Sequence, residues 1–314
     1  MRIAIASFTG RLVGFTRRLT AFAERPVEFI GRLAVAALVL LGLSSHCSYA
    51  EPPTLTRLFP AGAQQGTTVD VTLSGKLGDG EVSFWCSHPG VQWQKGEQEN
   101  QLRVTISQEA VPRLAWMRII NPEGVSAVKP FIIGNVPEQL EHEPNDLLAE
   151  AMPIESLPLL INGVLEKRGD VDQFRVSMQP GETLIASIQA ERGLQSEVDA
   201  SLQIVDTAGN VLAQNLDYHG LDPQIVWTSD REQDVLVRVF GFPASPNSTI
   251  ALAGGENYLY RLTLTTGPWC EGTLPLASST KEPTALMPVG WNLSNDLQLT
   301  IPPQATADGT FPFA

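Results

Sequence analysis

Histidine and cysteine are scarce in this sequence of 314 residues, which has only four histidines and three cysteines. So few of either residue leave little material for a zinc site or a disulfide framework. The motifs H-E-x-x-H and G-x-S-x-G, which mark many metallopeptidases and serine hydrolases, do not occur after residue 50. Cys86 and Cys270 are far apart, and their spacing indicates no disulfide. The sequence therefore predicts a chain that is not an enzyme.

Basic residues are also few, with 21 lysines and arginines against 34 aspartates and glutamates. Six of the basic and two of the acidic residues lie in residues 1–50, so 15 and 32 remain after that point, a net charge near −17. Nucleic acids and anionic membrane surfaces attract basic footprints, and this balance argues against both as partners. It favours cations, basic surfaces or plain solubility.

The N-terminus lacks an apolar run long enough to span a bilayer. Residues 33–43 are apolar without a break, which is eleven residues against the roughly 20 that a spanning helix needs. Six arginines precede this run, and Ser48 and Ala50 supply small residues at the positions that signal peptidase reads. We therefore predict a signal peptide over residues 1–50 and a secreted, periplasmic or cell-surface protein. An uncleaved anchor, which would be the sole attachment to a membrane, remains open.

Residues 51–135 are divided into short strand-like segments by glycine- and proline-rich turns. The segments are 69–73, 81–85, 102–106, 116–120 and 128–133. Several short strands at this spacing are typical of a small β-sandwich. The motifs LFPAG at 58–62, VDVTLSG at 69–75 and NPEGVS at 121–126 resemble the immunoglobulin-like IPT/TIG module over residues 53–134.

A second series of strand-like segments follows an acidic, aperiodic stretch at 136–146 that is typical of a linker. The segments are 173–178, 183–190, 200–205, 225–228, 234–240 and 258–264. The sequence thus predicts an all-β chain of two consecutive β-sandwiches, immunoglobulin-like and then jelly-roll-like, the second over residues 147–266. Residues 267–314 are predicted to form a tail or the start of a further β-module.

The second series resembles the bacterial pre-peptidase C-terminal domain, an accessory module of many extracellular peptidases. The resemblance covers about residues 140–266. The motifs that carry it, in order, are EPND at 143–146, GVL at 163–165, GDVDQF at 169–174, GETL at 181–184, DASL at 199–202, DTAGNVL at 206–212 and NYLYRL at 257–262.

This resemblance implies a calcium site. Related collagen-binding modules hold calcium with an E-x-E-x-N-D linker and a downstream aspartate cluster, and the matching residues here are Glu141, Glu143, Asn145, Asp146, Asp170 and Asp172. Calcium binds six to eight oxygen ligands, and five carboxylates with one amide are a suitable set. The alternative of a solvated acidic linker beside an ordinary turn remains open.

Tryptophans are the candidates for binding a polymer, since exposed aromatic rings stack on ligands at low entropic cost. Trp85, Trp116 and Trp227 lie in strand-like segments and are predicted to be core residues. Trp93, Trp269 and Trp291 lie outside them, and we predict that Trp93 and Trp269 contribute to binding.

The predicted function is that of a non-catalytic binding or spacer protein, accessory to extracellular protein or polymer processing. Its partner would be an extracellular protein, a polysaccharide or a secreted peptidase. Two alternatives remain open: a non-catalytic part of a secreted peptidase system, and a direct binder of collagen-like protein or polysaccharide.

Overall fold

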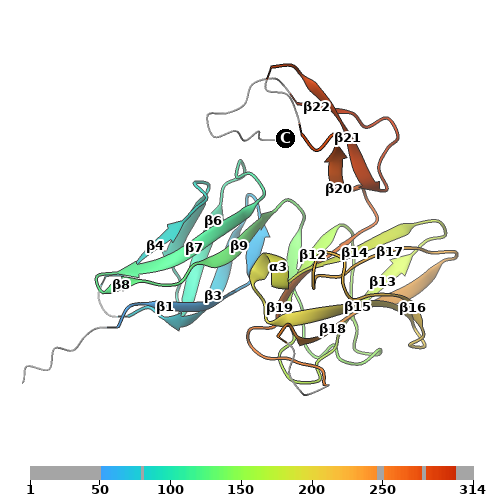
Figure 1. The fold of residues 1–314 in the computed structure, drawn as a ribbon. Coiled ribbons are helices and arrows are strands. Elements are labelled where there is room, and N and C mark those ends of the chain that lie inside the picture. Colours follow the sequence, from blue (N-terminus) through green and yellow to red (C-terminus); the bar gives the residue numbers. More distant parts are fainter. Residues whose placement is uncertain (1–50, 79–80, 246–250, 278–280, 302–314) are drawn as a thin grey trace, which may run out of the picture. The chain divides into compact units, whose positions relative to one another are not determined.

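The computed structural model describes residues 51–78, 81–245, 251–277 and 281–301, all within one compact unit that begins at Glu51. The predicted signal peptide or anchor at residues 1–50 lies outside the described residues. Among the described residues, no helix has the length and apolar character needed to cross a membrane. The prediction of an all-β chain with consecutive sandwiches is confirmed (Figure 1).

The first sandwich has nine strands. They are β1 (Thr54–Phe59), β2 (Gly62–Gln64), β3 (Thr68–Lys76), β4 (Ser83–Cys86), β5 (Val91–Lys95), β6 (Gln101–Ile106), β7 (Leu114–Asn121), β8 (Gly124–Val125) and β9 (Lys129–Gly134). One sheet has the order β1-β3-β6-β5, and the other has the order β2-β9-β7-β4 with β8 paired to β7.

Alternation along these strands builds the core of the first sandwich. In β3, Val71 and Leu73 are buried whereas Thr72 between them is exposed. Successive side chains of a strand point to opposite faces, so such alternation buries one face of the sheet. Met117 and Phe131 of the second sheet pack in the same cluster, which joins the two sheets face to face.

The second sandwich has ten strands and one short helix. They are β10 (Glu138–Leu140), β11 (Met152–Pro153), β12 (Leu159–Val164), β13 (Asp172–Met178), β14 (Thr183–Gln189), α3 (Glu191–Leu194), β15 (Val198–Asp206), β16 (Val211–Asn215), β17 (Gln224–Thr228), β18 (Gln233–Pro243) and β19 (Leu259–Thr265). The sheet orders are β10-β12-β19-β14-β17 and β11-β13-β18-β15-β16. A large apolar cluster fills the space between the two sheets.

The stretch expected to be a linker adds an edge strand to one sheet of this sandwich. β10 pairs in parallel with β12, and β11, a few residues further on, pairs in parallel with β13 of the opposite sheet. The acidic residues 141–146 therefore cross from the edge of one sheet toward the edge of the other. Their backbone is held at both ends by sheet pairing.

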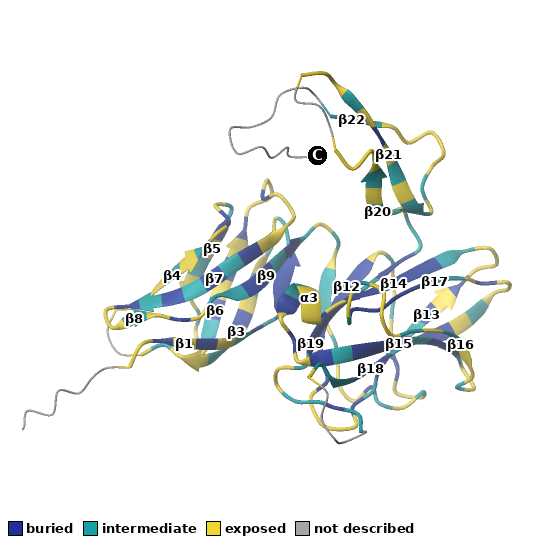
Figure 2. Cartoon of the chain, in the orientation of Figure 1, coloured by how far each residue is buried: buried dark blue, intermediate teal, exposed yellow. Residues whose placement is uncertain are grey.

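The strand β12 shows no alternation because both of its faces are covered, and all six of its residues are buried (Figure 2). Leu159 and Ile161 enter the core of the second sandwich. Val164, on the other face, packs with Ala61 of the first sandwich. A strand buried on both faces has no alternation of apolar and polar residues, so the pattern of β12 does not mark it as a strand in the sequence.

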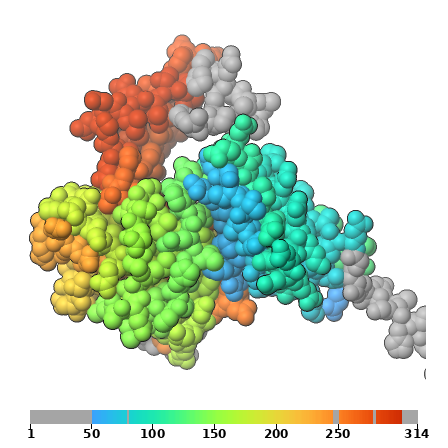
Figure 3. Space-filling model, turned by 180° about the vertical axis from the view of Figure 1, so that it is seen from behind, coloured from blue at the N-terminus to red at the C-terminus, as the bar shows by residue number. Residues whose placement is uncertain are grey.

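An ion pair buried between the two sandwiches joins them. Arg261 of β19 has no exposed surface, and its guanidinium donates to Glu138 (2.6 Å) and to the Ile132 carbonyl of the first sandwich (3.2 Å). The Cβ of any larger residue at Gly62 would lie 1.4 Å from the Arg261 guanidinium. In Figure 3, blue residues of the first sandwich lie against green residues of the second along this junction.

Residues beyond the second sandwich form a three-stranded antiparallel sheet. Its strands are β20 (Trp269–Leu274), β21 (Thr284–Trp291) and β22 (Leu299–Ile301). Most of their side chains are exposed or half-buried, in contrast to the strands of the sandwiches (Figure 2). Cys270 of β20 and Cys86 of β4 are both free thiols.

Three expectations about tryptophans were wrong. Trp116 was expected in the core, but it is half-buried between the buried Ala115 and Met117 of β7 and so lies on the other face of the strand. Trp85 was expected in the core but is 44% exposed, because it points outward from β4. Trp93 was expected outside the strands, but it lies in β5 and packs against the first core, with its ring 5.0 Å from Phe131 in an edge-on contact. Trp93 is therefore not an exposed binding platform.

The packing of Trp93 predicts a structural role. We expect Trp93→Ala to lower the free energy of unfolding by about 2 kcal/mol, less than the loss for a fully buried ring. Trp85→Ala should lower it by less than about 0.5 kcal/mol, because surface substitutions usually have small effects. Urea unfolding of both variants measures the difference, and equal stabilities would contradict this assignment.

Candidate metal centre

Three carboxylates meet at the end of the second sandwich where residues 141–146 cross it. Glu143, Asp170 and Asp172 each offer an oxygen, and these oxygens lie within 4.8 Å of one another. Asp172 is the first residue of β13, and Asp170 lies in the turn just before it. Glu143 follows β10 on the crossing segment. The cluster thus joins the crossing segment to the start of a core strand.

The turn before β13 positions Asp170. Gly169 has φ +90°, a left-handed conformation that glycine adopts without strain. The Asp170 carboxylate accepts a 2.5 Å hydrogen bond from the Glu166 N–H, which folds the side chain back over its own turn. Asp170 is fully buried as a result.

Several buried oxygens in this region accept no hydrogen bond. Asp170 Oδ1 and Asp172 Oδ1 are both buried without a donor, although Lys167 Nζ lies 3.4 Å from Asp170 Oδ1. Asn145 has no exposed surface, and neither its side-chain oxygen nor its nitrogen has a partner. Its backbone N–H donates to Glu143 (3.1 Å), which places it beside the cluster. Buried polar atoms in proteins almost always have a partner, so these unpaired atoms make the cluster a candidate site for a cation.

Glu141 connects to the cluster through a tyrosine hydroxyl. Tyr260 of β19 is fully buried, and its hydroxyl lies 2.6 Å from a carboxylate oxygen of both Glu141 and Asp172. One hydroxyl proton can serve only one of these two acceptors at a time. Gly163 leaves the space that Tyr260 and Glu141 occupy, because a Cβ there would lie 2.1 Å from the Tyr260 ring and 2.6 Å from Glu141 Oε2. The other Glu141 oxygen accepts from the Val164 N–H (2.5 Å).

The carboxylates of the cluster resist ionisation. Burial raises the pKa of Glu141 to about 7, partly offset by its hydrogen bonds. Burial also raises the pKa of Asp172 well above its ordinary value, and the charge of Glu141 raises it further. The pKa values of Asp170 and Glu143 are raised by burial as well. A cation among them would favour their charged forms.

Asp146 has a different environment from the other predicted ligands. Its carboxylate pairs with Lys167 (2.9 Å) and accepts from the Val171 N–H (3.2 Å). The hydrogen bond with Lys167 lowers its pKa. Asp146 therefore holds the crossing segment against the turn before β13 from the solvent side.

The six predicted ligands lie in one region and differ in their contacts. Glu143, Asp170 and Asp172 lie together, and Asn145 is beside them. Glu141 interacts with Asp172 directly and through Tyr260, and Asp146 interacts with Asp170 as well as with Lys167. Sequence reasoning missed the roles of Tyr260 and Lys167. The NYLYRL motif contains Tyr260, but a strand pattern does not reveal which buried hydroxyl reaches a carboxylate.

The predicted binding residue Trp269 lines a separate cleft beside β20. This cleft has a volume of about 390 Å³ and lies against the outer face of β14 and β19. The Trp269 indole N–H donates to Glu271, which also accepts from Gln224 (2.5 Å) and lies 3.2 Å from His219 Nε2.

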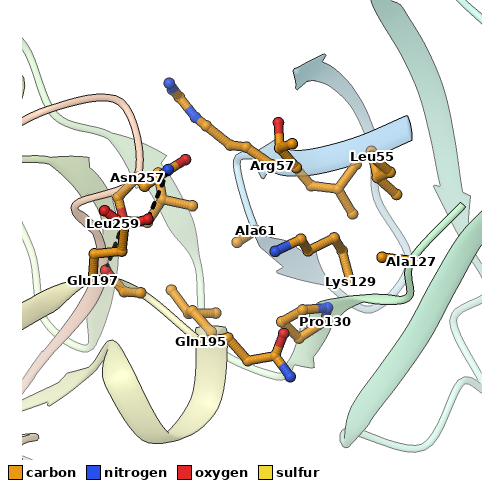
Figure 4. Close-up of a pocket in the computed structure, with 14 residues that line it drawn as sticks. Leu55, Arg57, Ala61, Ala127, Lys129, Pro130, Gln195, Glu197, Asn257 and Leu259 are labelled. Carbon is orange, nitrogen blue, oxygen red and sulfur yellow. Dashed lines mark hydrogen bonds between the residues drawn. The ribbon is translucent and has the colours of Figure 1, made fainter. Parts of the chain in front are cut away.

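A second hollow, of about 330 Å³, lies between the first sandwich and the region around α3 (Figure 4). Arg57 and Lys129 come from the first sandwich, and Figure 4 shows them opposite Glu197 and Asn257. Asn257 donates to Glu197 (3.0 Å). No aromatic side chain lines this hollow, which distinguishes it from the cleft beside β20.

No protein-family model matches the chain, and no curated protein matches it. Among solved structures, the chain is similar to the pre-peptidase C-terminal domain of a collagenase from Bacillus anthracis. The two are 15% identical, the match covers 42% of this chain and 100% of that domain, and the TM-score is 0.27.

Two glycan-related proteins are also similar over a longer part of the chain. One is SGBP-B of the mixed-linkage glucan utilisation locus of Bacteroides ovatus, in complex with a heptasaccharide, which is 10% identical to this chain. The match covers 68% of this chain and 75% of that one, and the TM-score is 0.22. SGBP-B from a xyloglucan utilisation locus of Bacteroides uniformis is 11% identical, with 69% and 73% covered and a TM-score of 0.24. These similarities assign the chain to no family, and the likeness of residues 53–134 to the IPT/TIG module stays a prediction.

Proposed function

We propose that the chain is a secreted, non-catalytic binding protein of the pre-peptidase C-terminal type, whose second sandwich is completed by a calcium ion. The observation that carries this proposal is the set of buried, unpartnered oxygens of Asn145, Asp170 and Asp172 beside the carboxylate of Glu143. Buried polar groups without partners cost free energy, and a cation would satisfy them together.

The chemistry of the donors favours calcium over softer metals. All the candidate ligands are carboxylate or amide oxygens, which are hard donors. Histidine and cysteine, which zinc prefers, take no part in this group. The ion would be held by Glu143, Asp170, Asp172 and Asn145. A further ligand would be Glu141, which lies beside Asp172 and Tyr260.

A calcium ion here would fix the crossing segment to the sandwich. Glu143 and Asn145 belong to the segment between β10 and β11, whereas Asp170 and Asp172 precede or begin β13. An ion shared by both would tie the two sheet edges together at that end. The binding free energy would therefore contribute directly to stability.

Two of the histidines are held by neighbouring groups in a way that is compatible with the proposed non-catalytic role. His88 is buried, accepts from the Gly90 N–H (3.0 Å) and contacts the Val111 carbonyl (3.1 Å), so both ring nitrogens are engaged by backbone. His219 is engaged with Glu271.

Backbone hydrogen exchange tests the proposed ion site directly. We expect peptides covering residues 138–150 and 159–175 of the full chain to exchange more slowly in calcium than in excess chelator, because the ion joins these segments. Peptides from β6 and β7 of the first sandwich serve as the internal control and should not change. Equal exchange of residues 138–150 in both conditions would contradict the proposal.

The raised pKa values predict an unusual dependence of stability on pH in chelator. The folded pKa of Glu141 is about 7, above its ordinary value of 4.5, so the folded state holds more protons between these values. The free energy of unfolding therefore falls as pH rises through this window, since the Glu141 carboxyl ionises more easily in the unfolded state. Asp172, which faces Glu141 across Tyr260, shifts in the same direction, as does the neighbouring Glu143.

Melting temperatures between pH 5 and 8 measure this effect. In chelator the melting temperature should decline with pH, and Glu141→Gln should flatten the decline. Saturating calcium should remove it, because the ion binds the ionised carboxylates. A chelated protein that becomes more stable from pH 5 to 7 would contradict the assigned shifts.

A further inference from the structure

The cleft beside β20 has a polar floor on the outer face of a sheet whose other face forms the core. Ser187 of β14 and Thr263 of β19 are directly paired across the two strands, and both line the cleft. Their neighbours Ile188 and Leu262 are buried in the core behind them. The floor therefore offers two hydroxyl groups on a rigid backbone, each of which can donate and accept.

One wall of the cleft is an aromatic ring held in a fixed orientation. The indole N–H of Trp269 is bound by Glu271, and the same carboxylate accepts from Gln224. Burial alone would raise the pKa of Glu271, but hydrogen bonds from Gln224 and Trp269 and the neighbouring His219 leave it below its ordinary value. The carboxylate therefore stays ionised and keeps the Trp269 ring in place.

Further aromatic residues support this wall. His219 makes an edge-on contact with Tyr218, at 4.6 Å between ring centroids, and Tyr218 lies 6.5 Å from Trp291. Trp291 is the direct partner of Trp269 across β20 and β21. Rings fixed in this way lose little freedom when a ligand stacks on them.

The opposite wall comes from α3 and the residues near it. Arg192 is exposed and lines the cleft, and Asp222 is buried there with its carboxylate accepting from the Glu191 N–H (2.8 Å). Gln189 at the end of β14 is exposed beside them. Charges of both signs are thus present, and both carboxylates in the cleft are already hydrogen-bonded.

We infer that this cleft is a binding site for a neutral carbohydrate. A sugar ring has an apolar face that stacks on an aromatic side chain and a rim of hydroxyls that both donate and accept, which matches Trp269 opposite Ser187, Thr263, Gln189 and Arg192. The volume of about 390 Å³ lies within the range of small-ligand clefts, roughly 300–1,000 Å³. The inference deepens the proposed binding function by naming the ligand class and its place, and it does not depend on the calcium ion.

A neutral glycan fits better than a charged or apolar ligand. An acidic chain would meet Glu271 and Asp222 and the strong negative charge of the protein. A basic peptide would find those two carboxylates already occupied by internal donors. The cleft presents one aromatic wall with polar groups on its other sides, the usual arrangement of a small polar-ligand site.

Calorimetric titration of the full chain with soluble neutral oligosaccharides tests the inference. The panel is hexasaccharides of β-linked glucose, xylose, mannose and N-acetylglucosamine, with oligogalacturonate as the acidic comparison and gelatin as the protein comparison. We expect at least one neutral sugar to bind and the other two probes to fail. Absence of binding by every neutral sugar at millimolar concentration would overturn the inference, as would preferential binding of gelatin or oligogalacturonate.

Two variants locate the site. Trp269→Ala should weaken binding about tenfold or more, which corresponds to the loss of one stacking contact. Arg192→Ala, which removes an exposed side chain and so should leave folding intact, should weaken it several-fold. Trp85→Ala is the matched control, since Trp85 is an exposed tryptophan on the first sandwich. Unchanged affinity in both test variants, or an equal loss in Trp85→Ala, would overturn the site.

The same samples separate this inference from the calcium proposal. Trp269→Ala should keep the calcium-dependent change in melting temperature, which also shows that the variant is folded. Sugar binding that persists in chelator alongside a missing calcium response would leave the glycan site standing and remove the ion site. A calcium response without sugar binding would do the reverse.

Discussion

Calcium should raise the melting temperature of the chain by about 5–10 °C when its free concentration is about 100-fold above the dissociation constant. Saturation at that ratio stabilises a folded protein by about 2.7 kcal/mol, and each kcal/mol shifts the melting temperature of a protein of this size by roughly 2–4 °C. Extracellular calcium modules bind with dissociation constants on the order of 10⁻⁴ to 10⁻³ M, so about 10–100 mM calcium approaches this limit.

Substitutions in the cluster should abolish this response. Asp172→Asn removes a charge whose carboxylate is fully buried and has one orphaned oxygen. We expect it to lose the calcium-dependent shift and to raise the melting temperature in chelator, because it relieves repulsion with Glu141 and Asp170. Asp230→Asn is the control, since that exposed carboxylate lies 3.8 Å from the neighbouring Arg231 and is not part of the cluster. Scanning calorimetry in calcium and in chelator measures all three proteins, and a full calcium shift in Asp172→Asn would contradict the assignment.

Breaking the ion pair between Arg261 and Glu138 should cost about 3–5 kcal/mol of stability. Glu138→Ala would leave the Arg261 guanidinium buried without its carboxylate, and such an uncompensated charge is strongly destabilising. Asn162 would also lose the acceptor of its 2.9 Å hydrogen bond to Glu138. Arg261 reaches the Ile132 carbonyl as well, so the loss would weaken the junction between the two sandwiches.

A double-mutant cycle distinguishes this pair from general packing. The double variant Glu138→Leu with Arg261→Leu should lose much less stability than the sum of the losses of the single variants Glu138→Leu and Arg261→Leu, because replacing both charges by apolar groups is often neutral or better. Urea unfolding should show one transition for the natural chain and a separation of two transitions in Glu138→Ala. Additive losses in the double variant would contradict a direct interaction between the two side chains.

Most strands of the two sandwich cores could be predicted from their β-forming residues and bounding turns, whether burial alternates along them, as in β6, or not, as in β14. In β18, Val235, Val237 and Val239 are all buried, and the predicted segment matched the strand closely. The strand β12 could not be predicted because both of its faces are covered. The strand β10 could not be predicted because it has only three residues, between acidic and proline-containing neighbours. Sheet pairing with distant strands fixes both segments, and pairing leaves no local pattern in a sequence.

The acidic motifs identified the right region of the chain, but the contacts within it depend on the fold. Glu143 and Asp170 are 27 residues apart and meet because β10 and β13 belong to opposite sheets joined at one end. Asp146 shares the motif and yet pairs with Lys167. The role of Tyr260 depends on Gly163, which leaves room for its hydroxyl beside Glu141. Trp93 lies in β5, a strand with little alternation, so the sequence does not indicate that its ring packs against the core.

The most direct test of the ion site is calorimetric titration of the full chain with calcium at pH 7 in two buffers of different ionisation enthalpy. The account predicts one ion per chain with release of protons, because the pKa of Glu141 is about 7 and that of Asp172 is raised. Asp172→Asn should remove the binding, and Asp230→Asn should retain it. Absence of calcium binding by the natural chain, or unchanged binding in Asp172→Asn, would contradict the account and leave residues 141–146 as an acidic segment held by sheet pairing alone.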